Sequence, residues 1–123
     1  LKDLNNLKID VSEGVEPSKM GSDILLMSMD ESFTLAEATD TNPKTLEAAK
    51  TIATERDQGS KLVGESIDGG WALRYEKDRD DGKTTYYLFA RRDVDGKAYF
   101  CQTSVGFKSL RDGALAACKT LRK

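Results

Sequence analysis

Apolar residues alternate with polar ones along most of the C-terminal half of the chain. The alternation runs through four stretches, 61–67, 70–77, 84–92 and 97–105, and a period of two is typical of β-strands that have one face in a core. The pairs Asp68-Gly69, Asp81-Gly82 and Asp95-Gly96 separate these stretches. Asp-Gly favours tight hairpin turns because both residue types tolerate positive φ angles. The pattern therefore predicts a four-stranded antiparallel meander.

The N-terminal half has a less regular pattern. Leu7, Ile9 and Val11 alternate with polar residues, which predicts a short strand followed by a loop that reaches residue 22. The compact apolar run 23–29 has the length of a strand buried on both faces, so we expect a central strand there. Ser32 is expected to cap a short helical turn that continues to residue 36.

Two segments have the three- and four-residue spacing of apolar positions that is typical of an amphipathic helix. The first helix is expected at about 43–58, with Asn42 as its N-cap and Pro43 in its first position. The second is expected at about 109–122, with Ser109 as its cap. Together the elements predict a single α+β domain, 1–123, in which an antiparallel sheet of five or six strands packs against both helices.

The chain has two cysteines, Cys101 in the last predicted strand and Cys118 on the apolar face of the terminal helix. Both lie where that helix is expected to pack on the sheet, which predicts a disulfide between them. In the chain-entropy model, a bridge over a loop of this length stabilises the fold by about 3 kcal/mol. The alternative is a pair of buried thiols in a cytosolic protein. A disulfide favours an oxidising compartment: the periplasm, the outer membrane of a tethered lipoprotein, or the exterior of the cell.

Composition restricts the classes of function. The 123 residues carry 19 basic and 21 acidic side chains, a net charge of −2, which argues against the basic surface that nucleic-acid binding requires. No apolar run approaches the roughly 20 residues of a transmembrane helix. The chain has no histidine, which excludes catalysis by a Ser-His-Asp or Cys-His group and histidine-based metal sites within it. Because the first residue is Leu1 rather than Met, we expect that a leader, a lipid-anchor segment or a tag was removed.

Aromatic residues are concentrated in the predicted meander, and the alternation of side chains places them on both faces of the sheet. Helix 43–58 is expected to cover the second face. The alternative is that part of this face is an exposed aromatic platform for a partner or ligand. The candidate binding residues are Trp71, Tyr87, Phe89 and Arg91, because aromatic and arginine side chains dominate the energetics of interfaces.

Motifs for catalysis or metal binding are lacking. The acidic stretches 30–31 and 78–81 do not follow the calcium-loop pattern of alternating oxygen ligands, and charged turns are ordinarily solvated. The hydroxyl residues near the last strand have no base beside them in the sequence to activate a nucleophile. We therefore assign no catalytic residue, no metal site and no cofactor.

Four segments of the C-terminal half form a familiar combination: residues 69–75 (Gly-Gly-Trp-Ala-Leu-Arg-Tyr), 86–89 (Tyr-Tyr-Leu-Phe), 96–101 (Gly-Lys-Ala-Tyr-Phe-Cys) and 118–122 (Cys-Lys-Thr-Leu-Arg). In this half the chain resembles the PsbP-like α/β sandwich family, to which small bacterial envelope lipoproteins belong. The resemblance implies a central antiparallel sheet with helices on both sides. It also implies a role as an assembly factor or adaptor rather than an enzyme.

These features favour a non-enzymatic protein of the cell envelope that binds another protein, as an adaptor, an assembly factor or a secretion accessory. A narrower alternative is an immunity protein that inhibits a toxin delivered to the periplasm. The alternative from another class is a small hydrolase that uses carboxylates such as Glu65, Glu76 and Asp78. A deep cleft with a strongly perturbed acid would favour the hydrolase, whereas a flat apolar or aromatic patch would favour the binding protein.

Overall fold

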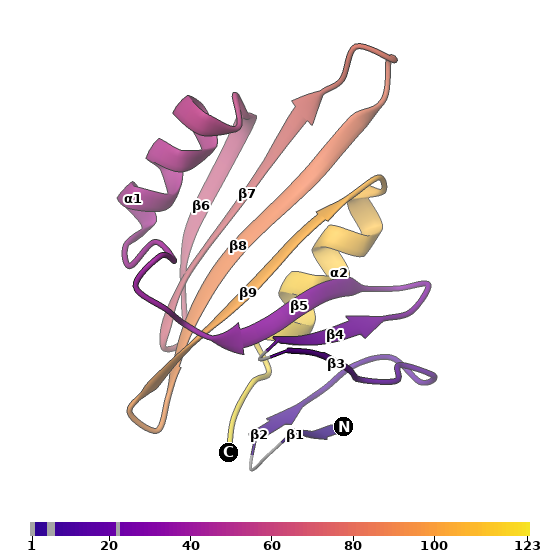
Figure 1. Cartoon of the computed structure of the whole chain (residues 1–123), viewed down its shortest axis with the longest axis vertical. Helices are drawn as coiled ribbons and strands as arrows, with labels where there is room; N and C mark the ends of the chain where they lie inside the picture. Colours follow the sequence, from indigo (N-terminus) through magenta and orange to yellow (C-terminus); the bar gives the residue numbers. More distant parts are fainter. Residues whose placement is uncertain (1, 5–6, 22) are drawn as a thin grey trace.

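The computed structural model describes residues 2–4, 7–21 and 23–123. Over these residues the chain forms a seven-stranded antiparallel sheet, in the order β3-β4-β5-β9-β8-β7-β6, with one helix on each face (Figure 1). The strands are β3 (Ser18–Met20), β4 (Asp23–Met27), β5 (Ser32–Glu37), β6 (Ser60–Ile67), β7 (Gly70–Asp78), β8 (Thr84–Val94) and β9 (Lys97–Val105). A separate antiparallel hairpin pairs β1 (Lys2–Leu4) with β2 (Leu7–Ile9).

The predicted meander is confirmed as β6 to β9, in which each strand pairs with the next along the chain. The turns differ in backbone conformation. At Asp95-Gly96 both residues have positive φ angles, 52° and 81°, as a type I′ turn requires. At Asp68-Gly69 only the glycine does, with φ at 74°, so this turn is of another type.

The N-terminal half corrects three predictions. With seven strands in the main sheet of the described residues, the expected number of five or six was too low, partly because β3 lies in a segment predicted to be a loop. The predicted helical turn at 32–36 is wrong: this segment is β5, in which Phe33 and Leu35 alternate into the core. The prediction of a central strand buried on both faces at 23–29 is also wrong. A strand does form there, β4, but it lies next to the edge strand β3, and Leu26 is buried whereas Leu25 is half-buried.

The first helix packs on one face of the sheet, as expected. It consists of α1 (Leu46–Thr51) and a π-helical continuation, η1 (Ile52–Arg56), and its buried Ala49 and Ala53 face an aromatic cluster of the meander. The predicted start at Pro43 is wrong. Thr45 is the N-cap, and its hydroxyl accepts the Ala48 N–H at 3.1 Å.

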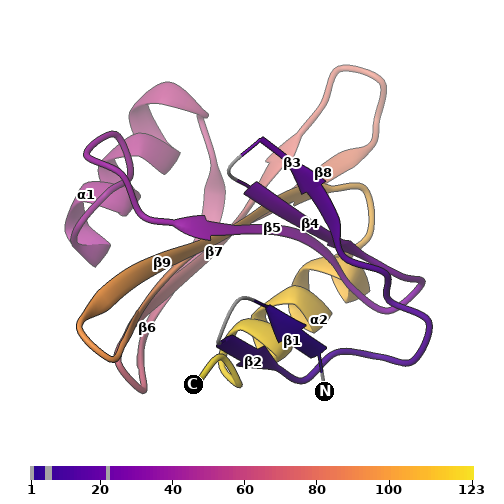
Figure 2. The same cartoon turned by 60° about the horizontal axis from the view of Figure 1, so that its bottom comes forward.

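The terminal helix α2 (Lys108–Cys118) packs on the opposite face, with the β1–β2 hairpin beside it (Figure 2). The predicted disulfide between Cys101 and Cys118 is present, with a Cα–Cα distance of 6.4 Å. The helix is shorter than the predicted 109–122, and its N-cap position is Phe107 rather than Ser109. Buried Arg92 donates hydrogen bonds of 2.8 Å to the carbonyl oxygens of Cys118 and Lys119 at the helix end, where a cation is favourable.

Candidate functional site

The helical segment α1–η1 covers only part of its face of the sheet (Figure 1). Beyond it, the same face continues over β8, β9, β5 and β4 and forms a groove of about 420 Å³. The groove is lined by Leu25 on β4, Ser32, Phe33 and Thr34 on β5, Arg56 and Asp57 at the end of η1, Tyr87 and Phe89 on β8, and Gln102, Thr103, Ser104 and Val105 on β9.

The floor of the groove follows directly from strand register. Phe89 lies opposite Gln102, Gln102 opposite Thr34, and Thr34 opposite Leu25. Residues opposite each other in antiparallel strands point to the same face, so these four side chains form one row across four strands. The row is apolar at its two ends and carries an amide and a hydroxyl between them.

The wall of the groove at the end of η1 is fixed by one carboxylate. Oδ1 of Asp57 accepts from Nε of Arg56 at 3.1 Å, and Oδ2 accepts from the hydroxyl of Tyr75. Burial raises the pKa of Tyr75 above its ordinary value, and the hydrogen bond to Asp57 raises it further. The phenol therefore remains a neutral donor at physiological pH. It also stacks on Tyr87, with ring centroids 4.7 Å apart, so the wall and the floor are held by the same side chain.

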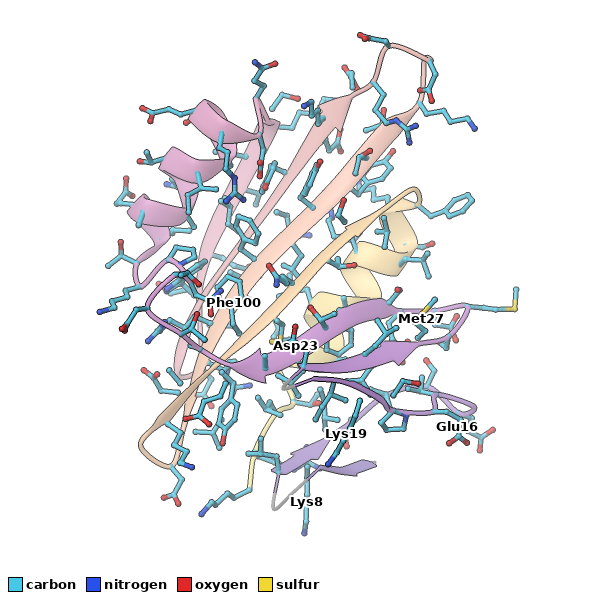
Figure 3. The ribbon with its side chains drawn as sticks, in the orientation of Figure 1. Lys8, Glu16, Lys19, Asp23, Met27 and Phe100 are labelled. Atoms are coloured by element: carbon cyan, nitrogen blue, oxygen red, sulfur yellow. A yellow bond between two sulfur atoms is a disulfide. The ribbon has the colours of Figure 1, made fainter. Side chains whose placement is uncertain are left out.

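The chemistry of the lining is apolar with uncharged polar groups. Arg56 and Asp57 form an ion pair, and the other lining residues are neutral. Met27, opposite Ser32 on the neighbouring strand, has 54% of its surface exposed, and Phe107, two residues beyond Val105, has 69% exposed. Met27 lies at the end of β4 (Figure 3). Exposed apolar side chains beside an apolar groove are typical of a surface that binds a partner.

The structure places two of the four predicted binding residues in this groove. Tyr87 and Phe89 line it, whereas Trp71 and Arg91 are not among the lining residues. Trp71 lies in the core beside Phe100, and its indole N–H donates to the carbonyl of Lys44 at 3.2 Å. Figure 3 shows Phe100 between the sheet and the helical segment. Arg91 is half-buried.

The remaining lining residues were not predicted. Gln102 and Ser104 are exposed positions in the second half of β9 and alternate with Cys101 and Thr103, so the period-two pattern of that strand contained a signal for them. The β5 residues carried no such signal, because the pairing of Thr34 with Gln102 joins distant parts of the chain.

The three carboxylates that a hydrolase was expected to use have separate partners. Glu65 pairs with Lys119 at 3.2 Å, Glu76 pairs with Lys61 at 3.3 Å, and Asp78 accepts a hydrogen bond from the Thr84 hydroxyl at 3.0 Å.

The described residues, 2–4, 7–21 and 23–123, contain neither a cluster of metal ligands nor a membrane-spanning helix. No group of three or more His, Cys, Asp or Glu side chains in them could hold a metal ion. No helix within them combines the length and the apolar character needed to cross a membrane.

Comparison of the chain with protein-family models, with curated proteins and with solved structures found no match. The resemblance to the PsbP-like family therefore stays a prediction, and the function has to be inferred from the geometry of the groove.

Proposed function

We propose that this chain is a non-enzymatic protein of an oxidising compartment that binds another protein through the groove on the α1 face. The observation that carries the proposal is the row Phe89, Gln102, Thr34 and Leu25, which runs out from beneath the helical segment. Phe89 is buried beside that segment, whereas Gln102 is exposed and Thr34 and Leu25 are half-buried. An apolar row with one amide and one hydroxyl suits a polypeptide, since a side chain can pack on its ends while backbone groups hydrogen-bond at its centre.

The surface around the groove favours a protein over a small ligand. Met27 and Phe107 extend the apolar surface beyond the cavity, so the contact area is wider than one enclosed pocket. Methionine is common at surfaces that adapt to a partner because its side chain is flexible and polarizable. A partner with apolar side chains and little charge would fit best, because the two charged lining residues neutralise each other.

The buried disulfide supports the proposed compartment. Cys101 and Cys118 are both fully buried, and disulfides form and persist in the periplasm, at the cell surface and in secreted proteins. We infer that the protein acts there as an adaptor, assembly factor or secretion accessory. Recovery of a toxin as the partner would identify the narrower role of an immunity protein.

A pair of matched variants tests the groove. Ser104→Arg places a long cation on the groove floor, and Thr51→Arg makes the same change on α1; both positions are exposed. Wild-type protein is used to capture candidate partners from an envelope extract, and each candidate is then purified and its Kd measured. We expect Ser104→Arg to weaken binding at least tenfold, because it fills the groove and adds an uncompensated charge. Thr51→Arg should leave the Kd unchanged, and equal affinities for both variants would disprove the proposed site.

A further inference from the structure

The sheet ends on one side in a long strand with an unoccupied edge. Within the part of the chain that the structure describes, β6 pairs with β7 and no strand pairs with its other edge. It has eight residues, whereas the opposite edge strand β3 has three. The middle of β6 exposes Val63, with 48% of its surface accessible. An exposed edge of this length is a template for pairing with another strand.

Three alternate residues of β6, Lys61, Val63 and Glu65, carry a positive, a neutral and a negative side chain. Lys61 contacts Glu76, Val63 lies opposite Arg74, and Glu65 contacts Lys119. Arg74 and Glu76 lie two residues apart in β7 and therefore share one face of the sheet. This is the face that carries α2, since Arg74 pairs with Asp112 of that helix. Lys61, Val63 and Glu65 therefore lie on one face, in the order positive, neutral, negative.

We propose that β6 pairs with β6 of a second copy of this chain, antiparallel and centred on Val63. Antiparallel pairing reverses the order of charges, so Lys61 of each copy lies opposite Glu65 of the other, and the two Val63 side chains meet at the two-fold axis. Each Lys61–Glu65 contact joins two ion pairs that already exist, Lys61 with Glu76 and Glu65 with Lys119. The result is an alternating row of four charges on each side of the axis. Self-complementarity of this kind is what a two-fold interface requires.

The same charges disfavour the two registers that are centred on the charged residues themselves. A shift that centres the pair on Glu65 sets Glu65 against Glu65, and a shift that centres it on Lys61 sets Lys61 against Lys61. Like charges directly opposite each other in a sheet are destabilising. Lys61 itself lies in a β-bulge between Ser60 and Val63 and has a φ of 55°, so it contributes its charge at the end of the paired segment and no regular ladder hydrogen bond. The bulge keeps the pairing short, so we expect a weak dimer that forms at high protein concentration.

Charge reversal provides the first test, with molar mass measured by light scattering or sedimentation over a range of concentrations. As the concentration of wild-type protein rises, its molar mass should increase from that of one chain toward that of two. Lys61→Glu and Glu65→Lys should each remain monomeric, because each sets like charges opposite each other. An equimolar mixture of the two variants should dimerise, since both interchain pairs are then of opposite sign. Lys108→Glu, an exposed lysine at the start of α2, is the matched control and should dimerise as wild type does.

A cysteine at the axis tests the register. Val63→Cys should form an oxidised dimer at least tenfold faster than Met29→Cys, although Met29 has 95% of its surface exposed, because only residue 63 faces its own copy. Wild-type protein that stays monomeric at millimolar concentration would overturn the proposal. Equal crosslinking of the two cysteine variants would overturn it as well, as would a mixture of the charge variants that stays monomeric.

Discussion

At the scale of single residues, Tyr75 connects the core to the groove. Its ring is fully buried, it stacks on Tyr87 with an interplanar angle of 2°, and its hydroxyl donates to Asp57. Asp57 in turn accepts from Arg56. The Tyr75 ring also contacts Phe89 edge to face, and Tyr87, Phe89, Asp57 and Arg56 all line the groove. Tyr75 itself was not predicted as a site residue, because it supports the lining from below.

Tyr75→Phe keeps the ring and removes the hydroxyl. At pH 7 we expect a loss of about 1 to 2 kcal/mol in the free energy of unfolding, since a hydrogen bond to a charged acceptor is lost. The pKa of tyrosine in an unfolded chain is about 10, whereas that of Tyr75 in the folded protein is raised. Above about pH 10 the unfolded chain therefore releases this proton and the folded protein retains it, which lowers the stability of the wild type.

The expected result is a difference between wild type and variant that is constant below about pH 9. Above about pH 10 the wild type should lose up to about 1.4 kcal/mol per pH unit more than the variant. Urea unfolding at several pH values measures both quantities. Because the two proteins differ only at residue 75, the comparison isolates the contribution of its hydroxyl group. A difference that persists unchanged to about pH 11 would show that the pKa of Tyr75 is ordinary.

At the scale of whole elements, local sequence signals were sufficient to predict the strands of the C-terminal half. The bounds of β6, β7, β8 and β9 differ from the predicted ones by at most two residues, because alternation and Asp-Gly turns act between neighbours in the chain. Tyr87 and Phe89 were candidate binding residues because aromatic side chains dominate interfaces, but the same criterion selected Trp71, which lies in the core. Cys101 was predicted in the last strand and Cys118 on the apolar face of the terminal helix. Their pairing could be predicted because that helix was expected to pack on the sheet.

The elements that were predicted wrongly depend on contacts with distant parts of the chain. Phe33 and Leu35 have the period-two spacing of a strand, but over the five residues 32–36 this signal is short, and Ser32 is also a suitable helix cap. The pairing of Leu35 with Cys101 decides for the strand, and that pairing joins the two halves of the molecule. Since β4 and β5 supply one side of the groove, that half of the site could not be derived from local patterns.

The contact between α2 and the β4–β5 hairpin gives a prediction about packing. A Cβ atom added at Gly113 would overlap the backbone carbonyl of Asp30, whereas one added at Gly106 would meet nothing within 4 Å. Alanine in a helix is favoured over glycine by up to about 1 kcal/mol, but overlap with backbone is not relieved by rotating a side chain. We expect Gly113→Ala to destabilise the fold by about 1 to 3 kcal/mol.

Gly106→Ala is the control for this contact and should change stability by no more than about 0.5 kcal/mol. Thermal and urea unfolding of both variants provide the comparison. If Gly113→Ala is as stable as wild type, then the hairpin can move away from α2, and the contact with Asp30 is not a constraint on the fold.

Over the whole molecule, the disulfide and Arg92 together tie the C-terminal helix to the middle of the sheet. Cys101 lies on β9, between β5 and β8 in the strand order, so the bridge joins α2 to a central strand. Arg92 on β8 binds the carbonyl oxygens that end the same helix. The covalent and the polar contact lie at the same end of α2 and fix it against neighbouring strands. The groove is on the opposite face, and it depends on this arrangement through β8 and β9.

Cys101→Ala combined with Cys118→Ala removes the bridge without leaving a buried thiol. The sequence separation of 17 between the cysteines corresponds in the chain-entropy model to about 3 kcal/mol, and we expect the free energy of unfolding to fall by about this amount. Because Arg92 still binds the end of α2, the variant should remain folded, with an unchanged far-ultraviolet circular dichroism spectrum. Wild-type protein unfolded with and without reductant gives a second measure of the same difference. Agreement of the two differences would place the effect in the bridge itself, whereas a variant as stable as the wild type would mean that packing and Arg92 alone hold the helix.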